Sequence, residues 1–291
     1  MHIGVLILPE FQWHTAQTTW GRAEAMGFDH AWTYDHLTWQ SFRNQAWYAA
    51  VPTLTAAALV TKTIRLGTLV ASPNFRHPVP FAKELITLDD VSKGRLILGV
   101  GAGGSGWDAT MLGQKAWTRR ERAGRFAEFV ELTDRLLRQL ETSYEGEFYS
   151  ADEARTYPGC VQQPRIPLAI AATGKRGMHL AATYGQIWVT NGDRTRNEMM
   201  NAKEGANVVR EQMRRLDDIC LQVGRDPQTL HRLVLSGPRL DSGLASVAAF
   251  QETSGRYAEI GVTDFVVHWP RPDEPYAADL ATFERIFANR S

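Results

Sequence analysis

Cysteine is scarce in this sequence, which has only Cys160 and Cys220 among 291 residues and no C-x-x-C pattern. This usage argues against a disulfide scaffold or a zinc site, and it fits a reducing cytosol. The sequence also lacks an apolar run of the ~18 residues that a membrane helix needs. Its first ten residues, MHIGVLILPE, have no basic segment before the apolar run, so they predict a core strand rather than a signal peptide. We therefore expect a cytoplasmic protein.

An excess of charge of either sign is also absent, because 32 Lys and Arg residues balance 32 Asp and Glu residues. Such a chain has no bulk field that draws it to nucleic acid or to a membrane surface. The sequence has no G-x-S-x-G nucleophile elbow, and its first predicted strand does not end in the His-x-His pair that a metal hydrolase would use. We predict a small-molecule substrate, with no metal, nucleic-acid or membrane partner.

Short, nearly continuous apolar segments are present, and they alternate with longer amphipathic ones along the chain. This alternation is typical of strands buried on both faces of a parallel sheet and of the helices that cover them. Eight strand–helix pairs predict an α/β fold, a (β/α)8 TIM barrel that forms a single domain over residues 1–291. Residues 140–165 are too many for a simple connector and predict an insertion. The expected strands are residues 2–8, 30–34, 64–70, 95–100, 167–172, 186–189, 231–236 and 264–268, and the expected helices are residues 16–26, 48–61, 80–91, 118–140, 175–183, 196–223, 244–260 and 278–288.

A glycine run follows the fourth predicted strand, in the stretch RLILGVGAGGSG. Its Gly101, Gly103 and Gly106 match the G-x-G-x-x-G dinucleotide fingerprint, which has to open a helix and precede a strand with an acidic ribose ligand. Here helical periodicity starts only near Thr118, and the middle of that helix lies where the acidic strand should be. The run therefore predicts a glycine loop that leaves a barrel strand and lets a flat ligand approach the backbone closely.

Polar residues gather where the predicted strands end, which is the functional face of a barrel. Asp35 and His36 end the second strand, and successive strand side chains face opposite sides, so one should face a ligand while the other braces a loop. The loop after the third strand carries four polar side chains, Ser72, Asn74, Arg76 and His77. After the fifth strand, a small-residue turn with two basic residues opens a helix. Free N–H groups and the helix dipole favour an anion there, which predicts a phosphate site at Thr173, Gly174, Lys175 and Arg176.

Three stretches in this order resemble the luciferase-like monooxygenase superfamily: YDHLTW, then RLGTLVASPNFRHPVPFAKELITLDDVSKGRLILGVGAGGSGWDATMLG, then PLAIAATGKRGMHLAATYGQIWVTNG. The resemblance covers about residues 1–235 and is strongest for the deazaflavin-dependent oxidoreductase branch. Members are (β/α)8 enzymes that use reduced FMN or the 8-hydroxy-5-deazaflavin coenzyme F420. The resemblance thus implies an oxidoreductase that transfers hydride between the deazaflavin and a small organic substrate. Two alternatives are a reduced-FMN monooxygenase that activates oxygen and a coenzyme-binding protein without turnover.

The resemblance also implies roles for individual residues. Asp35 and His36 match the Asp-His pair at the coenzyme's reactive edge, where the histidine handles a proton. Leu69 and Val70 match a bulge that backs the ring and contains a non-proline cis peptide in the deazaflavin branch. Ser72 matches a residue that bonds the coenzyme, the glycine loop lies under it, and the turn from Thr173 to Arg176 takes its phosphate. A basic groove of Arg65, Arg76, Lys175 and Arg176 would favour the polyanionic deazaflavin.

The sequence departs from the family pattern at Gly104, where sugar-oxidising relatives carry an acidic glutamate. Proton chemistry must then come from His36, from Asp108 if its loop folds back, or from substrate and water. Aromatic strand-end residues predict an apolar substrate pocket. Its predicted members are Trp13, Trp39, His77 and Trp107, with Trp269 as a further candidate. Because relatives commonly dimerise, the resemblance also points to a homodimer.

Overall fold

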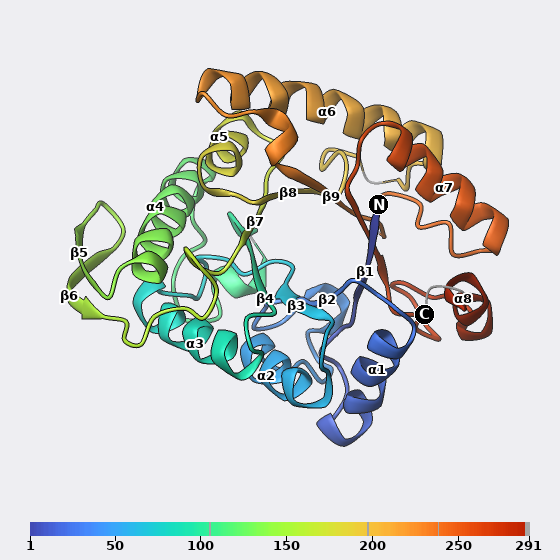
Figure 1. Cartoon of the computed structure of the whole chain (residues 1–291), viewed down its shortest axis with the longest axis horizontal. Coiled ribbons are helices and arrows are strands. Elements are labelled where there is room, and N and C mark those ends of the chain that lie inside the picture. Colours follow the sequence, from blue (N-terminus) through green and yellow to red (C-terminus); the bar gives the residue numbers. More distant parts are fainter. Residues whose placement is uncertain (105, 197, 238, 289–291) are drawn as a thin grey trace.

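The computed structural model describes residues 1–104, 106–196, 198–237 and 239–288. Within this part of the chain, eight parallel strands form a closed barrel in the order β1-β10-β9-β8-β7-β4-β3-β2 (Figure 1). The (β/α)8 prediction is confirmed, and each predicted strand overlaps an observed one. The barrel strands are β1 (His2–Leu6), β2 (His30–Thr33), β3 (Arg65–Thr68), β4 (Leu96–Gly101), β7 (Leu168–Ala171), β8 (Ile187–Thr190), β9 (His231–Leu235) and β10 (Asp264–His268).

Helices surround the barrel in chain order (Figure 1). They are α1 (Trp13–Ala25), α2 (Ala50–Val60), α3 (Pro78–Val91), α4 (Arg119–Arg138), α5 (Lys175–Tyr184), α6 (Ala202–Gln222), α7 (Val247–Glu259) and α8 (Leu280–Phe287), with short 3-10 turns η1 (Gln40–Phe42), η2 (Trp107–Ala109) and η3 (Pro227–Thr229). None of the helices in the described ranges is long and apolar enough to span a bilayer.

The predicted start of the sixth helix, at residue 196, is wrong. Helix α6 begins at Ala202, because the Asn201 side chain accepts the N–H of Glu204 at 3.0 Å and the Glu204 carboxylate accepts the N–H of Asn201. This reciprocal capping box fixes the first turn. Residue 197, inside the predicted helix, lies outside the described residues.

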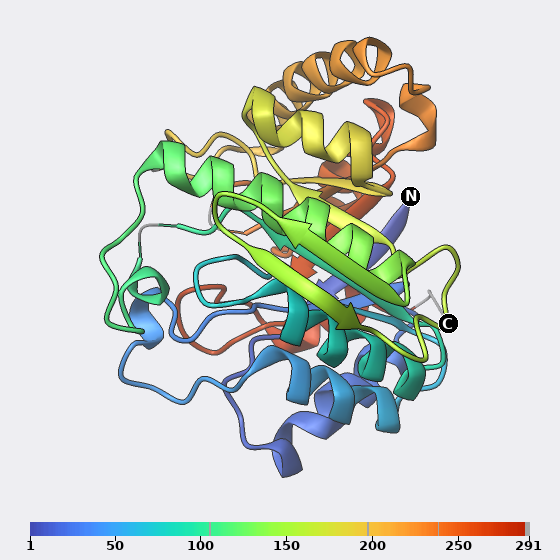
Figure 2. The same cartoon turned by 90° about the vertical axis from the view of Figure 1, so that its left-hand side faces the viewer.

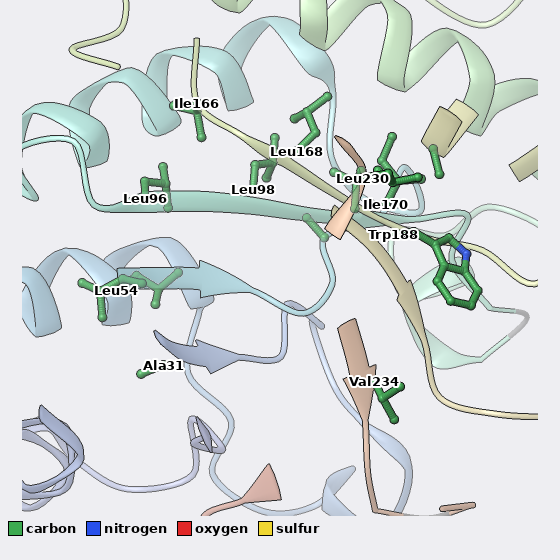
Figure 3. Packing of buried hydrophobic residues seen from close by; sticks show 14 of the residues in the cluster. Ala31, Leu54, Leu96, Leu98, Ile166, Leu168, Ile170, Trp188, Leu230 and Val234 are labelled. Carbon is green, nitrogen blue, oxygen red and sulfur yellow. The ribbon is translucent and has the colours of Figure 1, made fainter. Parts of the chain in front are cut away.

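The strands separate two apolar layers, because their side chains alternate between the helix side and the barrel interior. On β4, Leu96 and Leu98 pack outward with Leu168 and Ile170 of β7 (Figure 3), while Ile97 belongs to the interior cluster. The interior includes Trp32, and Gly67 on the adjacent strand makes room for it: a Cβ there would lie 2.4 Å from the indole ring. Both layers hold the strand ends rigidly, which positions the loops that follow them.

The insertion predicted over residues 140–165 contains an antiparallel hairpin of β5 (Glu141–Glu145) and β6 (Ser150–Arg155). It lies alongside α4 (Figure 2), and its turn is tied to that helix because the Glu128 carboxylate accepts the N–H groups of residues 147–149. The sequence predicted the insertion but not its strand pairing. Beyond the hairpin, the buried Arg165 side chain bonds Asp134 of α4 and leads the chain back into β7.

Candidate active site

A cavity of about 520 Å³ opens at the carboxyl ends of the barrel strands. This is the face on which the sequence predicts function, and the volume is in the range of small-molecule sites. Ten of the predicted site residues line the cavity, and Asp108 lies beside them. The ten are His36, Trp39, Leu69, Val70, Ser72, Gly101, Gly103, Gly104, Trp107 and Thr173.

A dyad of His36 and Asp108 forms one wall of the cavity. The loop after β4 folds back, so that His36 Nδ1 hydrogen-bonds the Asp108 carboxylate. Asp108 is buried, and its other oxygen accepts the backbone N–H groups of Leu37 at 2.8 Å and Thr38 at 3.2 Å. These donors orient the carboxylate, which can accept the proton that one imidazole tautomer carries on Nδ1. Nε2 takes no hydrogen bond from any described residue, so the neutral imidazole can accept a proton at that atom.

Asp35 lies on the other side of β2 from His36 and does not line the cavity. Only 2% of the residue is exposed, and its carboxylate accepts two bonds from Arg76, at 3.0 Å from Nε and 2.8 Å from Nη2. The expectation that one of the pair faces the ligand while the other braces a loop fits this geometry. We therefore correct the prediction of Asp35 as a catalytic residue: it positions the loop after β3.

Replacing Asp35 by asparagine should lower the free energy of unfolding by about 3 kcal/mol, because it leaves the Arg76 guanidinium largely uncompensated in a buried position. Chemical denaturation measures this loss. Glu84→Gln is the matched control, since Glu84 bonds the same arginine from a half-exposed position and should cost well under 1 kcal/mol. An Asp35→Asn variant that was as stable as the parent but much slower in turnover would contradict this assignment and support a catalytic role for Asp35.

A second wall of the cavity is made by the ends of β3 and β4, which follow β2 in the barrel order. The Leu69–Val70 peptide bond is cis, as the resemblance implied. Gly101 lets Val70 approach, since a Cβ there would lie 2.7 Å from Val70 Cγ2, and Gly103 adopts a φ of +72° beside Asn74. Gly104 differs, because no side-chain atom lies within 4 Å of a Cβ built on it. The wall is therefore close-packed at Gly101 and Gly103, and it has open space for a side chain at Gly104.

Several predicted site residues lie away from the cavity. Trp13 starts α1 and packs against the outer apolar layer, and Trp269 stacks edge-on against Phe283. His77 caps α3 by accepting the N–H of Val79, and its pKa is lowered by burial and by Arg125. The structure thus excludes Trp13 and His77 from the lining of the predicted substrate pocket.

The predicted phosphate turn is only partly at the cavity. Thr173 lines it, and Gly174 is the N-cap of α5 as expected. Lys175 and Arg176 are exposed and are not among the lining residues. Anion binding by the first turn of α5 stays a prediction, carried in the structure by Thr173 and the helix N-terminus.

The predicted basic groove is wrong in two of its members. Arg65 lies at the amino end of β3 and bonds Gln162, while Arg76 is committed to Asp35 and Glu84. The arginines at the cavity are instead Arg194 and Arg196 after β8 and Arg239 after β9. Asp193 is the nearby acid, and its pKa is lowered by hydrogen bonds from the N–H and hydroxyl of Thr195 and by the positive charges of Arg196 and Arg239.

Arg194 and Arg239 lie near each other without a carboxylate bonded to either of them in the described chain. The pKa of Arg194 is lowered by loss of water around its guanidinium and by the positive charges of Arg239 and Arg122. The Arg239 Nε is buried and takes no hydrogen-bond partner among the described residues. Clustered arginines that bond no carboxylate favour an anionic ligand. The sequence reasoning missed them, although their positions after β8 and β9 were a usable signal.

An aromatic and imidazole group closes the floor of the cavity. The Tyr34 hydroxyl lies 2.8 Å from His268 Nε2 and 3.2 Å from the Tyr276 hydroxyl, and Tyr276 stacks on His268. Burial lowers the pKa of His268 to about 3 and raises that of Tyr34, so all three groups are neutral near pH 7. With Trp39 they form an uncharged surface that excludes water.

The family model described as luciferase-like monooxygenase matches residues 1–287. The chain belongs to the luciferase-like monooxygenase family. The resemblance read from the sequence is thereby confirmed. Among similar luciferase-like proteins, an F420-dependent glucose-6-phosphate dehydrogenase of Amycolatopsis mediterranei is 28% identical, over 88% of this chain and 81% of that protein. An F420-dependent hydroxymycolic acid dehydrogenase of Mycobacterium tuberculosis is also 28% identical, over 92% of this chain and 69% of that one.

A solved structure shares the luciferase-like barrel of this chain. It is an F420-dependent secondary alcohol dehydrogenase in complex with an F420-acetone adduct, with a TM-score of 0.80 and 18% identity. The match covers 100% of this chain and 99% of the other. At that identity the likeness supports the fold, and the cavity residues of this chain have to carry the functional argument.

Proposed function

We propose that this chain is an oxidoreductase that transfers hydride between a deazaflavin coenzyme and a small organic substrate. The observation that carries the proposal is the cavity itself. There the His36–Asp108 dyad and a wall of Val70, Gly101 and Gly103 line the same cavity at the carboxyl end of a luciferase-like barrel. The names of the similar dehydrogenases support the choice of coenzyme.

The wall fits a flat ring system, because Gly101 and Gly103 contribute no side chain to the cavity and let Val70 and Asn74 pack close to the backbone. Leu69 and Ser72 extend this surface, and we assign both to coenzyme binding with Gly104 at its edge. Thr173, the N-terminus of α5 and the arginines after β8 and β9 provide the anion-binding part. A bound deazaflavin supplies two-electron hydride chemistry, while the protein orients it and excludes water.

In this proposal, His36 is the proton-handling group. Asp108 is a positioning residue, because it fixes the imidazole through Nδ1 and leaves Nε2 for the reaction. Trp39 and Trp107 line the substrate side, and Trp107 also carries Arg43 over its ring at 4.7 Å. The dyad supplies an acid–base pair despite the missing glutamate at Gly104.

A reduced-FMN monooxygenase is the second candidate, since the same wall would accept a flavin ring and the family takes its name from that activity. The arginine cluster favours the deazaflavin, whose tail carries more negative charge. A coenzyme-binding protein without turnover is the weakest candidate, supported only by Gly104.

Titration of the protein with oxidised and reduced deazaflavin and with oxidised and reduced FMN, followed by absorption and fluorescence, tests the proposal. We expect the deazaflavin to bind with a micromolar or lower Kd and more tightly than FMN. Coenzyme reduction is then measured with a panel that includes secondary alcohols and glucose 6-phosphate. Micromolar binding of FMN together with no binding of the deazaflavin would overturn the proposal, and no binding of either would end the enzymatic assignment.

A homodimer in the cytoplasm is part of the same proposal. It rests on the family resemblance and on the scarcity of cysteine, and analytical ultracentrifugation with fractionation of the source cells tests it.

A further inference from the structure

Three side chains that can bind a metal meet at the end of the barrel opposite the cavity. His2, His231 and Asp264 are the first residues of β1, β9 and β10, whereas the cavity is built on the carboxyl ends of the strands. His2 Nδ1 lies 3.3 Å from Asp264 Oδ1, and His231 Nδ1 lies 3.2 Å from Asp264 Oδ2. One ligand atom from each of the three residues lies within 4.8 Å of the other two.

The carboxylate of this cluster is held in place by further hydrogen bonds. The Trp32 indole N–H donates to His30 Nδ1 at 2.6 Å, which leaves the proton of a neutral His30 on Nε2. His30 Nε2 lies 3.1 Å from Asp264 Oδ1, and the Thr263 hydroxyl donates to Oδ2 at 2.6 Å. Asp264 is therefore a buried, oriented and ionised carboxylate. Such supporting bonds are the arrangement that orients ligands in protein metal sites.

The two histidines are free to adjust around this fixed point. Their side chains are 54% and 51% exposed, and their rings lie nearly parallel, with centroids 6.2 Å apart. Because both rings are exposed, they have room to rotate toward an ion, and zinc requires ligand nitrogens at ~2.0–2.1 Å.

We propose that His2, His231 and Asp264 form a binding site for a divalent transition-metal ion of the zinc class. Two imidazole nitrogens and one carboxylate oxygen suit zinc, with water completing the coordination. Magnesium and calcium prefer sites made of oxygen ligands, and they are excluded as the main occupants. Arg65 interacts electrostatically with Asp264 and opposes a cation, so the expected Kd is micromolar rather than nanomolar.

Occupancy would stabilise the closure of the barrel. The site would link three neighbouring strands. His2 of β1 lies directly opposite Asp264 of β10, and β9, which carries His231, pairs with the other edge of β10. A ligand that binds only the folded protein raises its stability with concentration. We expect Zn²⁺ at about 100 times its Kd to raise Tm by roughly 5 °C for a chain of this size.

The test uses the full chain with all affinity tags removed and after dialysis against a chelator. Calorimetric titration with ZnCl₂ should give one site per chain, and Co²⁺ should produce the visible absorption of a protein-bound ion. His231→Gln and His2→Gln should each weaken Zn²⁺ binding at least tenfold and abolish the rise in Tm. His179→Gln, which removes an exposed histidine on α5, is the matched control and should bind Zn²⁺ as the parent does.

Both exposed histidines can be changed without removing core packing, so the variants should fold, which circular dichroism checks. Unaltered Zn²⁺ affinity in His231→Gln, or a loss in His179→Gln equal to that in His231→Gln, would overturn the site. So would the absence of any heat or Tm change in the parent at millimolar Zn²⁺. The readouts do not involve coenzyme or substrate, so the result is independent of the proposed function.

Discussion

Replacement of His36 by asparagine is expected to lower kcat about 100- to 10,000-fold, the range lost when a general acid–base group is removed. The substrate is the member of the test panel that turns over fastest. The Kd of the deazaflavin, measured by titration, should change little, because in the proposed site the wall at the ends of β3 and β4 holds the ring and the arginines hold its anionic part. A His36→Asn variant with the kcat of the parent would show that His36 does not take part in the reaction.

Asp108→Asn separates positioning from loss of the base. The asparagine oxygen can still accept the N–H groups of Leu37 and Thr38, while its amide now faces His36 Nδ1 and favours the other tautomer. We expect kcat to fall about 100-fold with a changed pH profile, and Asp108→Glu to recover part of the activity. If Asp108→Asn lost stability instead, with kcat and the pH profile unchanged, the residue would be structural only.

Loss of the arginines after β8 and β9 should weaken binding of the anionic ligand. Each of Arg194→Gln and Arg239→Gln removes a charge-assisted hydrogen bond, and about a 10- to 100-fold increase in the deazaflavin Kd is expected for each. The double variant should also show a smaller dependence of Kd on salt concentration, because fewer charges attract the ligand. Fluorescence titration at two ionic strengths measures both effects.

Two controls locate the anion site. Arg214→Gln removes a strongly exposed arginine from α6 and should leave the Kd unchanged. Lys175→Gln and Arg176→Gln test the turn that the sequence singled out, and because both side chains are exposed outside the cavity lining, we expect a smaller effect than at Arg239. If Lys175→Gln raised the deazaflavin Kd more than Arg239→Gln does, the anion would bind at the α5 turn instead.

The barrel was predictable because its strands are buried on both faces and therefore appear as short apolar runs. The same reasoning placed His36, Trp39, Gly101 and Trp107 at the functional end, since strand ends of a barrel share one face. It could not tell which of Asp35 and His36 faces the cavity, because that depends on the partner of each: Arg76 for one and Asp108 for the other.

The arginines and Tyr276 were missed for a different physical reason. They come from the long loops after β8, β9 and β10, whose conformation follows from tertiary contacts rather than from any periodic pattern. Tyr276, for example, has a φ of +70° and is placed by stacking on His268. The α5 turn was found because its small residues, Lys175 and Arg176 are adjacent in sequence, whereas Arg194 and Arg239 are brought to the cavity from separate loops farther along the chain.

The pairing of β1 with β10 also bears on how the molecule is made. Residues 2–6 pair with β2 early in the chain, but their second partner strand is residues 264–268, and His268 and Tyr276 complete the cavity floor from the same late segment. A ribosome-bound chain that has emerged only as far as β9 therefore has an open sheet edge and an incomplete cavity. Contacts of such long sequence separation form late and slowly. Coenzyme binding should consequently begin only after synthesis has passed the last strand.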